Sequence, residues 1–470
     1  MSKFRNERDT MGEMQVPADA LYGASTARAV ENFPIANRPL PPGVIRAFGH
    51  LKAACAEANL DLAKLDAKLA PAIIAASSEV ADGKHDAQFP VDVYQTGSGT
   101  STNMNANEVI AALANEKLGF GATTQADGGV HPNDHVNMGQ SSNDTFPTAM
   151  HIAGAMVTQQ RLAPALEKLH LALKDKVDTW DTIVKIGRTH LMDATPIRIG
   201  QVFAGYAQQA HHGHCSAKFA NDCMRKNVEI GGTAVGTGIN THPEFAAKVC
   251  AILSERLGVD FSEAPIHPEA QAAKDCFVVA HGHLKSIAVS LSKIANDIRH
   301  LGSGPRCGIG ELNLPAIQPG SSIMPGKVNP VICESVMQVA CRVIGNDATV
   351  TMAGMGGIGS IFELNVAMPV MIDAFLESAS LLANVSNVLV DKLLVGLEVN
   401  EDRCKELIDQ SLMMVTSLAP VVGYEKAAVM AKEAHKTGQT IRQLCLEQEI
   451  LPVAQLDQLL DPDAMTRPSA

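Results

Sequence analysis

An apolar seam between Phe277 and Ile298 constrains the fold more than any other feature of this sequence. Its members are separated by three or four positions for three heptads, which is typical of a helix packed along others in a bundle. A second apolar stripe, from Leu162 to Trp180, predicts another long helix, and a third apolar helix is expected over about 376–397. The first seam consists of Phe277, Ala280, Leu284, Ile287, Leu291, Ile294 and Ile298.

The length and composition favour a mainly α protein with several domains. The chain has 470 residues, more than a single hydrophobic core usually organises, and only 4% of them are aromatic, which disfavours a mainly β fold. Changes in the helical pattern predict three domains. These are a mixed helical domain over 1–140, a central bundle of long helices over 141–397 and a small helical domain over 398–470.

Charge and cysteine usage exclude several classes of function. Lys and Arg total 38 against 50 Asp and Glu, a net charge of -12, which argues against nucleic-acid binding. The sequence contains no run of about 20 uninterrupted apolar residues, which a membrane span would need. Its charged N-terminus lacks the apolar core of a signal peptide. We therefore expect a cytoplasmic protein that does not bind membranes. The ten cysteines are scattered without a C-x-x-C pair, so no metal or iron–sulfur site is expected.

Two polar loops in the first third of the chain each lead into a predicted helix. The loop Thr96–Asn103 offers hydroxyls and backbone N–H groups that suit either an anion site or an ordinary helix cap. Thr102 stands where a dinucleotide-binding loop would need its third glycine, so that motif is rejected. The second loop, 131–147, contains more amides, hydroxyls and imidazoles than capping requires.

Two further loops lie within the predicted bundle. The loop Gly187–Pro196 contains His190, which could be structural or catalytic. The loop Pro319–Pro330 has the glycines and prolines of a mobile lid, together with the cation of Lys327. Asn329 and Pro330 are predicted to begin the next helix, which would place Glu334 near its first turn. That carboxylate could satisfy the helix dipole or orient a histidine from elsewhere.

Taken together, these loops resemble the fumarase/aspartase superfamily. The segment GSSIMPGKVNP at 320–330 is similar to the superfamily signature. TGSGTSTNMN at 96–105, QSSNDTFPTA at 140–149, GRTHLMDATP at 187–196 and GGTAVGTGIN at 231–240 look like class II fumarases rather than aspartases. The sequence departs from the usual class II pattern at Tyr22–Arg28 and at Ile197–Ile199.

The resemblance implies reversible trans addition of water to fumarate, giving (S)-malate in the tricarboxylic acid cycle, without metal or organic cofactor. It also implies a homotetramer with a central helical core, whose sites are shared between subunits. By the family pattern Ser321 is the base, and His190 paired with Glu334 handles the proton of the water. Lys327 stabilises the anionic intermediate. The implied substrate contacts are Ser98, Thr100, Ser141, Ser142, Asn143, Thr189, Ser322, Lys327 and Asn329, and a second anion site would comprise His131, Asn133 and Asp134.

Three alternatives remain open at this stage. The nearest is an aspartate ammonia-lyase of the same superfamily, which would release ammonia. An iron–sulfur hydratase would need three clustered cysteine ligands that this sequence lacks. A catalytically silent structural protein on the same fold, as some lens crystallins are, is disfavoured because Ser321, Lys327, Asn329, His190 and Glu334 are all present.

Overall fold

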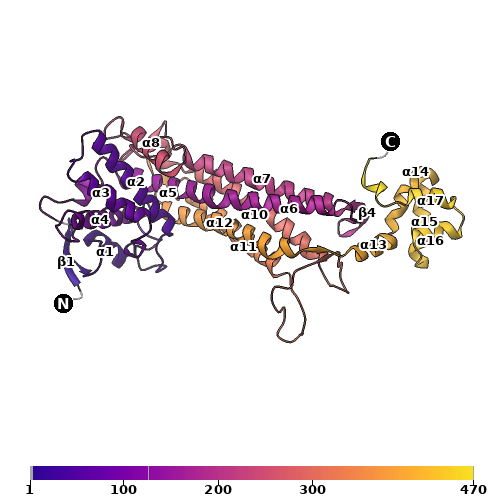
Figure 1. The fold of residues 1–470 in the computed structure, drawn as a ribbon. Coiled ribbons are helices and arrows are strands. Elements are labelled where there is room, and N and C mark those ends of the chain that lie inside the picture. The colour runs from indigo at the N-terminus through magenta and orange to yellow at the C-terminus, as the bar shows by residue number, and fades with distance from the viewer. Residues whose placement is uncertain (1–3, 125, 469–470) are drawn as a thin grey trace. The chain divides into compact units, whose positions relative to one another are not determined.

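The structure, a computed structural model, describes residues 4–124 and 126–468 and is mainly helical, as predicted. Figure 1 shows its helices and the short strands between them. The helices are α1 (Ala24–Asn32), α2 (Pro42–Asp61), α3 (Ala70–Ala81), α4 (Thr100–Lys117), α5 (Ser142–Val157), α6 (Ala163–Trp180), α7 (Ile199–Arg225), α8 (Phe245–Leu257), α9 (His267–Ala272), α10 (Asp275–Leu301), α11 (Val331–Gly354), α12 (Met368–Val388), α13 (Glu401–Gln410), α14 (Ala419–Val422), α15 (Tyr424–Thr437), α16 (Ile441–Glu447) and α17 (Val453–Leu459).

The strands of the described chain form four two-stranded antiparallel sheets. They are β1 (Phe4–Asp9) with β2 (Gly12–Pro17), β3 (Val184–Thr189) with β4 (Met192–Arg198), β5 (Leu312–Asn313) with β8 (Glu398–Val399), and β6 (Ser360–Ile361) with β7 (Leu364–Asn365). The predicted loop 187–196 is therefore largely the hairpin β3–β4. Strand β4 lies between the tip of this hairpin and α7.

The chain divides into two compact units, each assembled from three segments. Unit 1 consists of Met1–Pro164, His214–Ala288 and Cys341–Ala383. Unit 2 consists of Ala165–Gly213, Val289–Ala340 and Asn384–Ala470. The three sequence domains proposed above remain a prediction.

Unit 1 contains α1–α5, which are drawn in indigo and purple in Figure 1. Helix α2 packs against α3, α5 and α8, and α4 packs against α1 and α3. Phe48, Ile73 and Phe146 are fully buried in this core. Gly49 permits α2 to approach α3 closely, since a Cβ at this position would lie 2.3 Å from the backbone nitrogen of Ala81. Replacing it would force the two helices apart.

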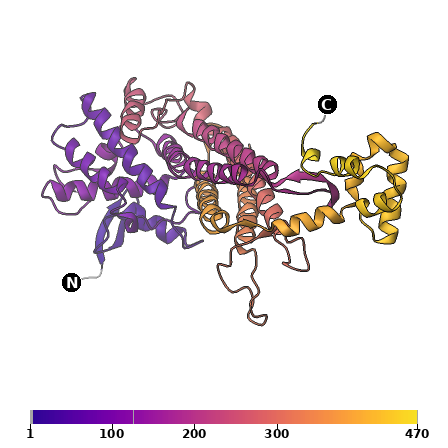
Figure 2. The ribbon, with the colours of Figure 1, turned by 45° about the vertical axis from the view of Figure 1, so that its right-hand side comes forward.

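Unit 2 contains a separate hydrophobic cluster built mainly by the C-terminal helices. Figures 1 and 2 both show α14–α17 gathered in this part of the chain. Leu418, Met430, Leu444 and Leu456 are buried there, and Ile186 of β3 joins them. The hairpin β3–β4 is thus held by residues more than 200 positions further along the sequence. Both figures also show the segment between α10 and α11 leaving the helices as a long irregular loop.

The predicted helical patterns agree with the structure to different degrees. All seven residues of the Phe277–Ile298 seam are buried in α10, and the Leu162–Trp180 stripe coincides with α6 and the turn before it. The third apolar helix begins earlier than predicted, because α12 starts at Met368, but helical turns continue beyond Val388 to Gly396, close to the predicted end. Asp373 and Glu377 interrupt its apolar pattern, but both are accommodated by ion pairs with arginines.

Residues 368–396 form the one stretch, within the described ranges, that is long and apolar enough to cross a membrane. Half of its most apolar window is nevertheless buried inside the protein. In unit 1, Met371, Ile372 and Phe375 of α12 are fully buried, and Ser378 lies 2.9 Å from Nε2 of His281. This burial is typical of the core helix of a globular protein.

Candidate functional site

The first two predicted loops meet in unit 1, at the N-termini of α4 and α5. The Ser98 hydroxyl lies 3.0 Å from that of Thr100, which in turn lies 2.8 Å from the hydroxyl of Ser142. The side-chain amide of Asn143 donates a 2.8 Å hydrogen bond to the carbonyl of Ala234. Four of the predicted substrate contacts are thus brought together by the fold. Together with Ser141, they are called the polar cluster below.

Gly99 allows the first loop to reach this position. Its φ of +73° lies in the left-handed region, and a Cβ there would lie 2.0 Å from the ring of Phe146. A larger residue would therefore clash with the core of α5 while adopting a strained backbone. This glycine lets Ser98 and Thr100 approach the start of α5.

The buried carboxylate of Asp144 holds the polar cluster in place through hydrogen bonds. Ser141 is the N-cap of α5, and the Asp144 carboxylate accepts its N–H at 2.9 Å, which completes a capping box. The other carboxylate oxygen accepts N–H groups from Gly231 at 3.1 Å and Thr233 at 2.8 Å. Burial raises the pKa of Asp144 to about 6, against the opposing effect of these three backbone hydrogen bonds. One carboxylate therefore joins the motifs at 140–149 and 231–240.

The predicted second anion site forms a compact local turn. His131 is the N-cap of the turn Pro132–Val136, and its Nδ1 accepts the N–H of Asp134 at 3.2 Å. The Asp134 carboxylate lies 3.2 Å from the same ring nitrogen, with its side chain 76% exposed. Asn133 is also exposed. The visible role of His131 is capping, and anion binding there stays a prediction.

In unit 2, Thr189 and His190 occupy the tip of the β3–β4 hairpin. Thr189 pairs with Met192, so His190 and Leu191 form a two-residue turn with φ values of 57° and 63°. Both Thr189 and His190 are exposed. At the base of the hairpin, buried Glu311 accepts ion pairs from Arg188 at 2.8 Å and Lys185 at 3.2 Å. The strand is thereby fixed while its tip stays accessible.

The predicted catalytic loop closes on itself through backbone contacts. Gly320 donates its N–H to the carbonyl of Lys327 at 2.8 Å, and the Asn329 amide donates to the carbonyl of Gly320 at 2.6 Å. The Ser321 hydroxyl oxygen accepts two N–H groups, from Ile323 at 3.2 Å and Met324 at 3.1 Å. Ser322 is exposed in the same loop. The fold thus directs two donors at the oxygen of Ser321.

The predicted cap of the following helix is shifted by one residue. Helix α11 begins at Val331, and the Pro330 carbonyl accepts the N–H of Glu334. The helix therefore begins one residue later than predicted, so Asn329 lies one residue before the cap position. Its side chain closes the preceding loop instead of capping α11. Glu334 does lie in the first turn of α11, as predicted.

Two predicted site residues of unit 2, His190 and Lys327, are exposed and line cavities. Lys327 and Asn329 line a cavity of about 700 Å³, while His190 lines another of about 340 Å³; His300 borders both. Within residues 4–124 and 126–468, no hydrogen bond or ion pair reaches the side chains of His190, Lys327 or Glu334. The structure therefore does not pair His190 with Glu334 inside one chain, and their partnership stays a prediction.

Sequence reasoning missed three buried charged groups that support these loops. Asp144 lies inside a recognised motif, and the spacing Ser141–Asp144 is a capping-box signal that could have found it. Lys52 is fully buried in α2 and donates to the side-chain oxygens of Asn137 at 3.0 Å and Gln140 at 2.9 Å. Burial lowers the pKa of Lys52 to about 8. The partners of Lys52 and Glu311 are distant in sequence, so no local signal marked them.

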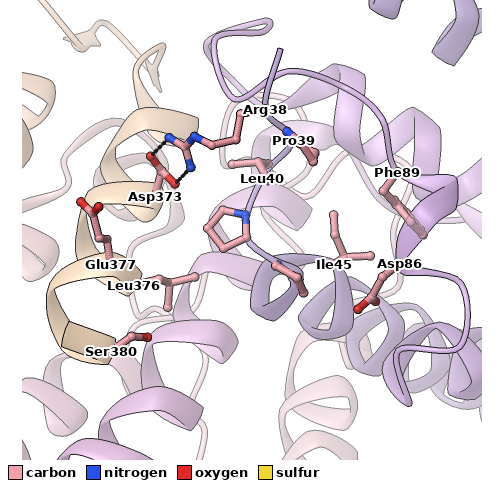
Figure 3. Close-up of a pocket in the computed structure, with 12 residues that line it drawn as sticks. Arg38, Pro39, Leu40, Ile45, Asp86, Phe89, Asp373, Leu376, Glu377 and Ser380 are labelled. Atoms are coloured by element: carbon pink, nitrogen blue, oxygen red, sulfur yellow. Dashed lines mark hydrogen bonds and ion pairs between the residues drawn. The ribbon is translucent and has the colours of Figure 1, made fainter. Parts of the chain in front are cut away.

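A separate cavity of about 430 Å³ in unit 1 contains none of the predicted site residues. Figure 3 shows the Arg38 guanidinium facing the Asp373 carboxylate, to which it donates hydrogen bonds of 2.8 and 2.6 Å. This ion pair joins the segment before α2 to α12. Among the residues that the structure describes, no group of three or more His, Cys, Asp and Glu side chains is arranged to hold a metal ion.

Comparisons with known proteins agree with this arrangement. Residues 12–345 match the lyase family model, and residues 414–467 match the model of the fumarase C C-terminus. The chain is 53% identical to the class II fumarate hydratase of Corynebacterium glutamicum, covering 98% of this chain and 96% of that protein. It is 51% identical to the class II fumarate hydratase of Mycobacterium tuberculosis, covering 99% and 97%.

Solved structures give the same result. The recombinant class II fumarase from Schistosoma mansoni superposes with a TM-score of 0.95 at 36% identity, covering 99% of this chain and all of that one. The fumarate lyase:delta crystallin from Brucella melitensis bound to cobalt gives 0.93 at 43% identity, with the same coverage. The long matches, together with the loops that carry the signature segments, show that this chain belongs to the class II fumarases of the fumarase/aspartase superfamily.

Proposed function

We propose that this protein catalyses the reversible trans addition of water to fumarate, giving (S)-malate, as a cytoplasmic hydro-lyase of the tricarboxylic acid cycle. Full-length relatives named class II fumarate hydratase support this activity. The observation that carries the mechanism is the pair of N–H groups directed at the Ser321 oxygen. Hydrogen bonds donated to an oxygen favour its anionic form, which is the form a serine needs to act as a base.

The remaining residues match the charge that develops during the reaction. Removing the proton next to a carboxylate of malate creates a dianionic aci-carboxylate, so preorganised donors and positive charge are needed around it. Lys327 supplies the cation, and Asn329, Thr100, Asn143 and Thr189 supply hydrogen-bond donors. Ser98, Ser141, Ser142 and Ser322 complete the contacts to the substrate carboxylates. His190, oriented by Glu334, exchanges the proton of the water or leaving hydroxide.

A homotetramer with shared sites explains why these groups are unpaired in a single chain. His190, Lys327 and Glu334 are exposed, as are large apolar side chains on the long helices, such as Phe219 at 56% and Val289 at 55%. Closed assembly of identical chains would cover such faces. In this proposal, the loops around Asn143, His190 and Lys327 come from three different subunits to form each site.

Subunit mixing tests the shared sites quantitatively. Ser321→Ala and His190→Asn chains are mixed equally, unfolded and reassembled, and exchange is verified by native mass spectrometry. Each site then draws its serine and its histidine independently, so about one quarter of parental activity should return. Complete inactivity in mixtures that have exchanged subunits would contradict the proposal, because sites built within one chain cannot recover.

The substrate is tested with the purified protein and two candidate compounds. Fumarate should yield malate, whereas L-aspartate should yield no ammonia beyond the level of a Ser321→Ala control. Substantial release of ammonia with little malate would instead identify an aspartate ammonia-lyase of the same superfamily. The absence of both products from folded protein would indicate a silent structural role.

A further inference from the structure

A bulge interrupts the β3–β4 hairpin between its base and the tip that carries His190. Ile186 pairs with Pro196, and Arg188 pairs with Asp193, so one residue of β3 lies opposite two residues of β4. A bulge disrupts the ladder of backbone hydrogen bonds and allows the strand to bend. The ladder alone therefore does not fix the direction of the tip relative to the base.

The buried carboxylate of Glu311 contacts β3 on both sides of this bulge. Its Oε2 atom accepts a 2.8 Å hydrogen bond from Nη1 of Arg188, on the tip side. The same oxygen lies 3.2 Å from Nζ of Lys185, on the base side. Glu311 is fully buried, whereas the side chain of Arg188 is 16% exposed. Removing one partner of a buried ion pair leaves an uncompensated charge, so these contacts are costly to break.

Glu311 is itself held by two elements of unit 2 outside the hairpin. Its backbone N–H donates a 2.9 Å hydrogen bond to the carbonyl of Leu301, the last residue of α10. Its carbonyl accepts the N–H of Asn400, the N-cap of α13, at 2.9 Å. The ion pair with Arg188 therefore attaches the tip side of the hairpin to the helices of this unit. All of these contacts lie within one chain, so they do not depend on assembly.

We propose that Glu311 is a positioning residue for His190, and that it acts through Arg188 on the tip side of the bulge. One residue separates Arg188 from His190, so a shift of the backbone at Arg188 displaces the imidazole as well. In the hydratase reaction proposed above, on which this assignment rests, His190 exchanges the proton of the water. The imidazole must lie within hydrogen-bond reach of that oxygen, and misplacement by about 1 Å can cost about 10²-fold in rate.

Lys185 provides a matched control for Arg188. Both side chains contact the same oxygen, so removing either one leaves Glu311 paired with the other. Neither Arg188→Met nor Lys185→Met therefore leaves a buried carboxylate without a cation. The two variants differ in which side of the bulge they release, and the proposal assigns the catalytic effect to the tip side alone.

Steady-state hydration of fumarate by the full-length protein compares the two variants. Arg188→Met should lower kcat at least about tenfold and leave KM within about threefold, because the position of a proton-transfer group matters in the transition state. Lys185→Met should keep kcat within about threefold of the parent. Equal losses of kcat in the two variants, or an undiminished kcat in Arg188→Met, would overturn the proposal.

A double-mutant cycle with His190→Asn shows whether Arg188 acts through the imidazole. If it does, adding Arg188→Met to His190→Asn should lower kcat by less than about twofold, because no imidazole is left to misplace. A purely structural role would lower kcat as much in this background as in the parent. A further loss of about tenfold would therefore contradict the proposal.

Glu311 itself is tested by Glu311→Met in the Lys185→Met background. Replacing a buried ion pair by apolar residues of similar volume is often neutral for stability, and the remaining Arg188 is partly exposed to water. Relative to Lys185→Met, this double variant should lose kcat at least about tenfold, as Arg188→Met does relative to the parent. A folded double variant with the kcat of Lys185→Met would overturn the proposal.

Amide hydrogen exchange separates this assignment from the proposed function. In Arg188→Met, the backbone N–H groups of residues 188–193 should exchange at least about tenfold faster than in the parent, while those of α3 in unit 1 stay unchanged. Lys185→Met should leave the tip as in the parent. An inactive parent with this exchange pattern would refute the hydratase function and retain Glu311 as the anchor of the tip. Unchanged exchange at the tip in Arg188→Met would overturn the anchor itself.

Discussion

The predicted site residues of the two units are held in different ways. In unit 1, the polar cluster is bonded within itself, and Asp144 ties it to the loop at 231–234. In unit 2, the backbones of the hairpin tip and of the loop at 320–329 are fixed, but the side chains of His190 and Lys327 are exposed. Within one chain the fold thus satisfies the predicted substrate contacts of unit 1, whereas it leaves His190 and Lys327 of unit 2 accessible to a substrate or a neighbouring subunit.

The largest effect should come from removing a proton-transfer group of unit 2. Ser321→Ala and His190→Asn should each lower kcat by about 10²–10⁴, the usual contribution of a general acid or base. Because His190 is exposed and Ser321 holds only a local turn, each free energy of unfolding should stay within about 0.5 kcal/mol of the parent. Steady-state hydration kinetics and urea unfolding measure the two effects.

The contrast between the two units would not hold if these substitutions lowered both kcat and the free energy of unfolding. A loss of several kcal/mol of stability would mean that the exposed groups of unit 2 carry structural contacts like those of unit 1. Turnover within a few-fold of the parent in Ser321→Ala would remove the serine from its proposed role as base.

A second, smaller effect concerns the pH dependence of unit 1. The folded pKa of Asp144, about 6, exceeds the value of about 3.9 expected in the unfolded chain, so the native state binds the proton more tightly. Stability should therefore fall as pH rises from about 4 to 6 and then level off. Measured against Asp144→Asn, which cannot titrate, the parent should lose about 3 kcal/mol across this range.

Urea unfolding of both proteins at several pH values between 4 and 7 provides the test. The difference between parent and Asp144→Asn should change with pH, while the contributions of other titrating groups cancel. A constant difference would show that the carboxyl group titrates as it does in the unfolded chain. Burial of the Asp144 carboxylate would then cost the native state no free energy.

The smallest effect is expected at the hairpin tip. Leu191 adopts a φ of 63°, which costs a non-glycine residue about 1–2 kcal/mol. Leu191→Gly should therefore raise the free energy of unfolding by about 0.5–1 kcal/mol, after the greater entropy of the unfolded glycine chain is counted. Leu191→Ala retains the strain and should not be stabilised. Thermal unfolding of the two variants distinguishes strain relief from loss of the exposed leucine side chain.

The sequence revealed those features whose causes are local. The three-and-four spacing of Phe277–Ile298 predicted α10 because a buried helix face repeats with that period, and the polar loops marked the starts of α4 and α5. The hairpin at His190 was missed because its position depends on Glu311 and on the C-terminal cluster, which are distant in sequence. Burial of Lys52 likewise depends on Asn137 and Gln140, which no local pattern identifies, and the contacts of Asp144 with Gly231 and Thr233 lie outside its local capping box.

The packing of Ile186 against the C-terminal cluster has a consequence for the order of events during synthesis. Residues as late as Leu456 cover this side chain, so about 270 further residues must be translated before β3 can find its native environment. At 5–20 residues per second this interval lasts roughly 15–50 s. The nascent chain therefore carries an uncovered apolar strand next to His190, the histidine predicted to be catalytic, for most of its time on the ribosome, and a truncated product would keep that defect permanently.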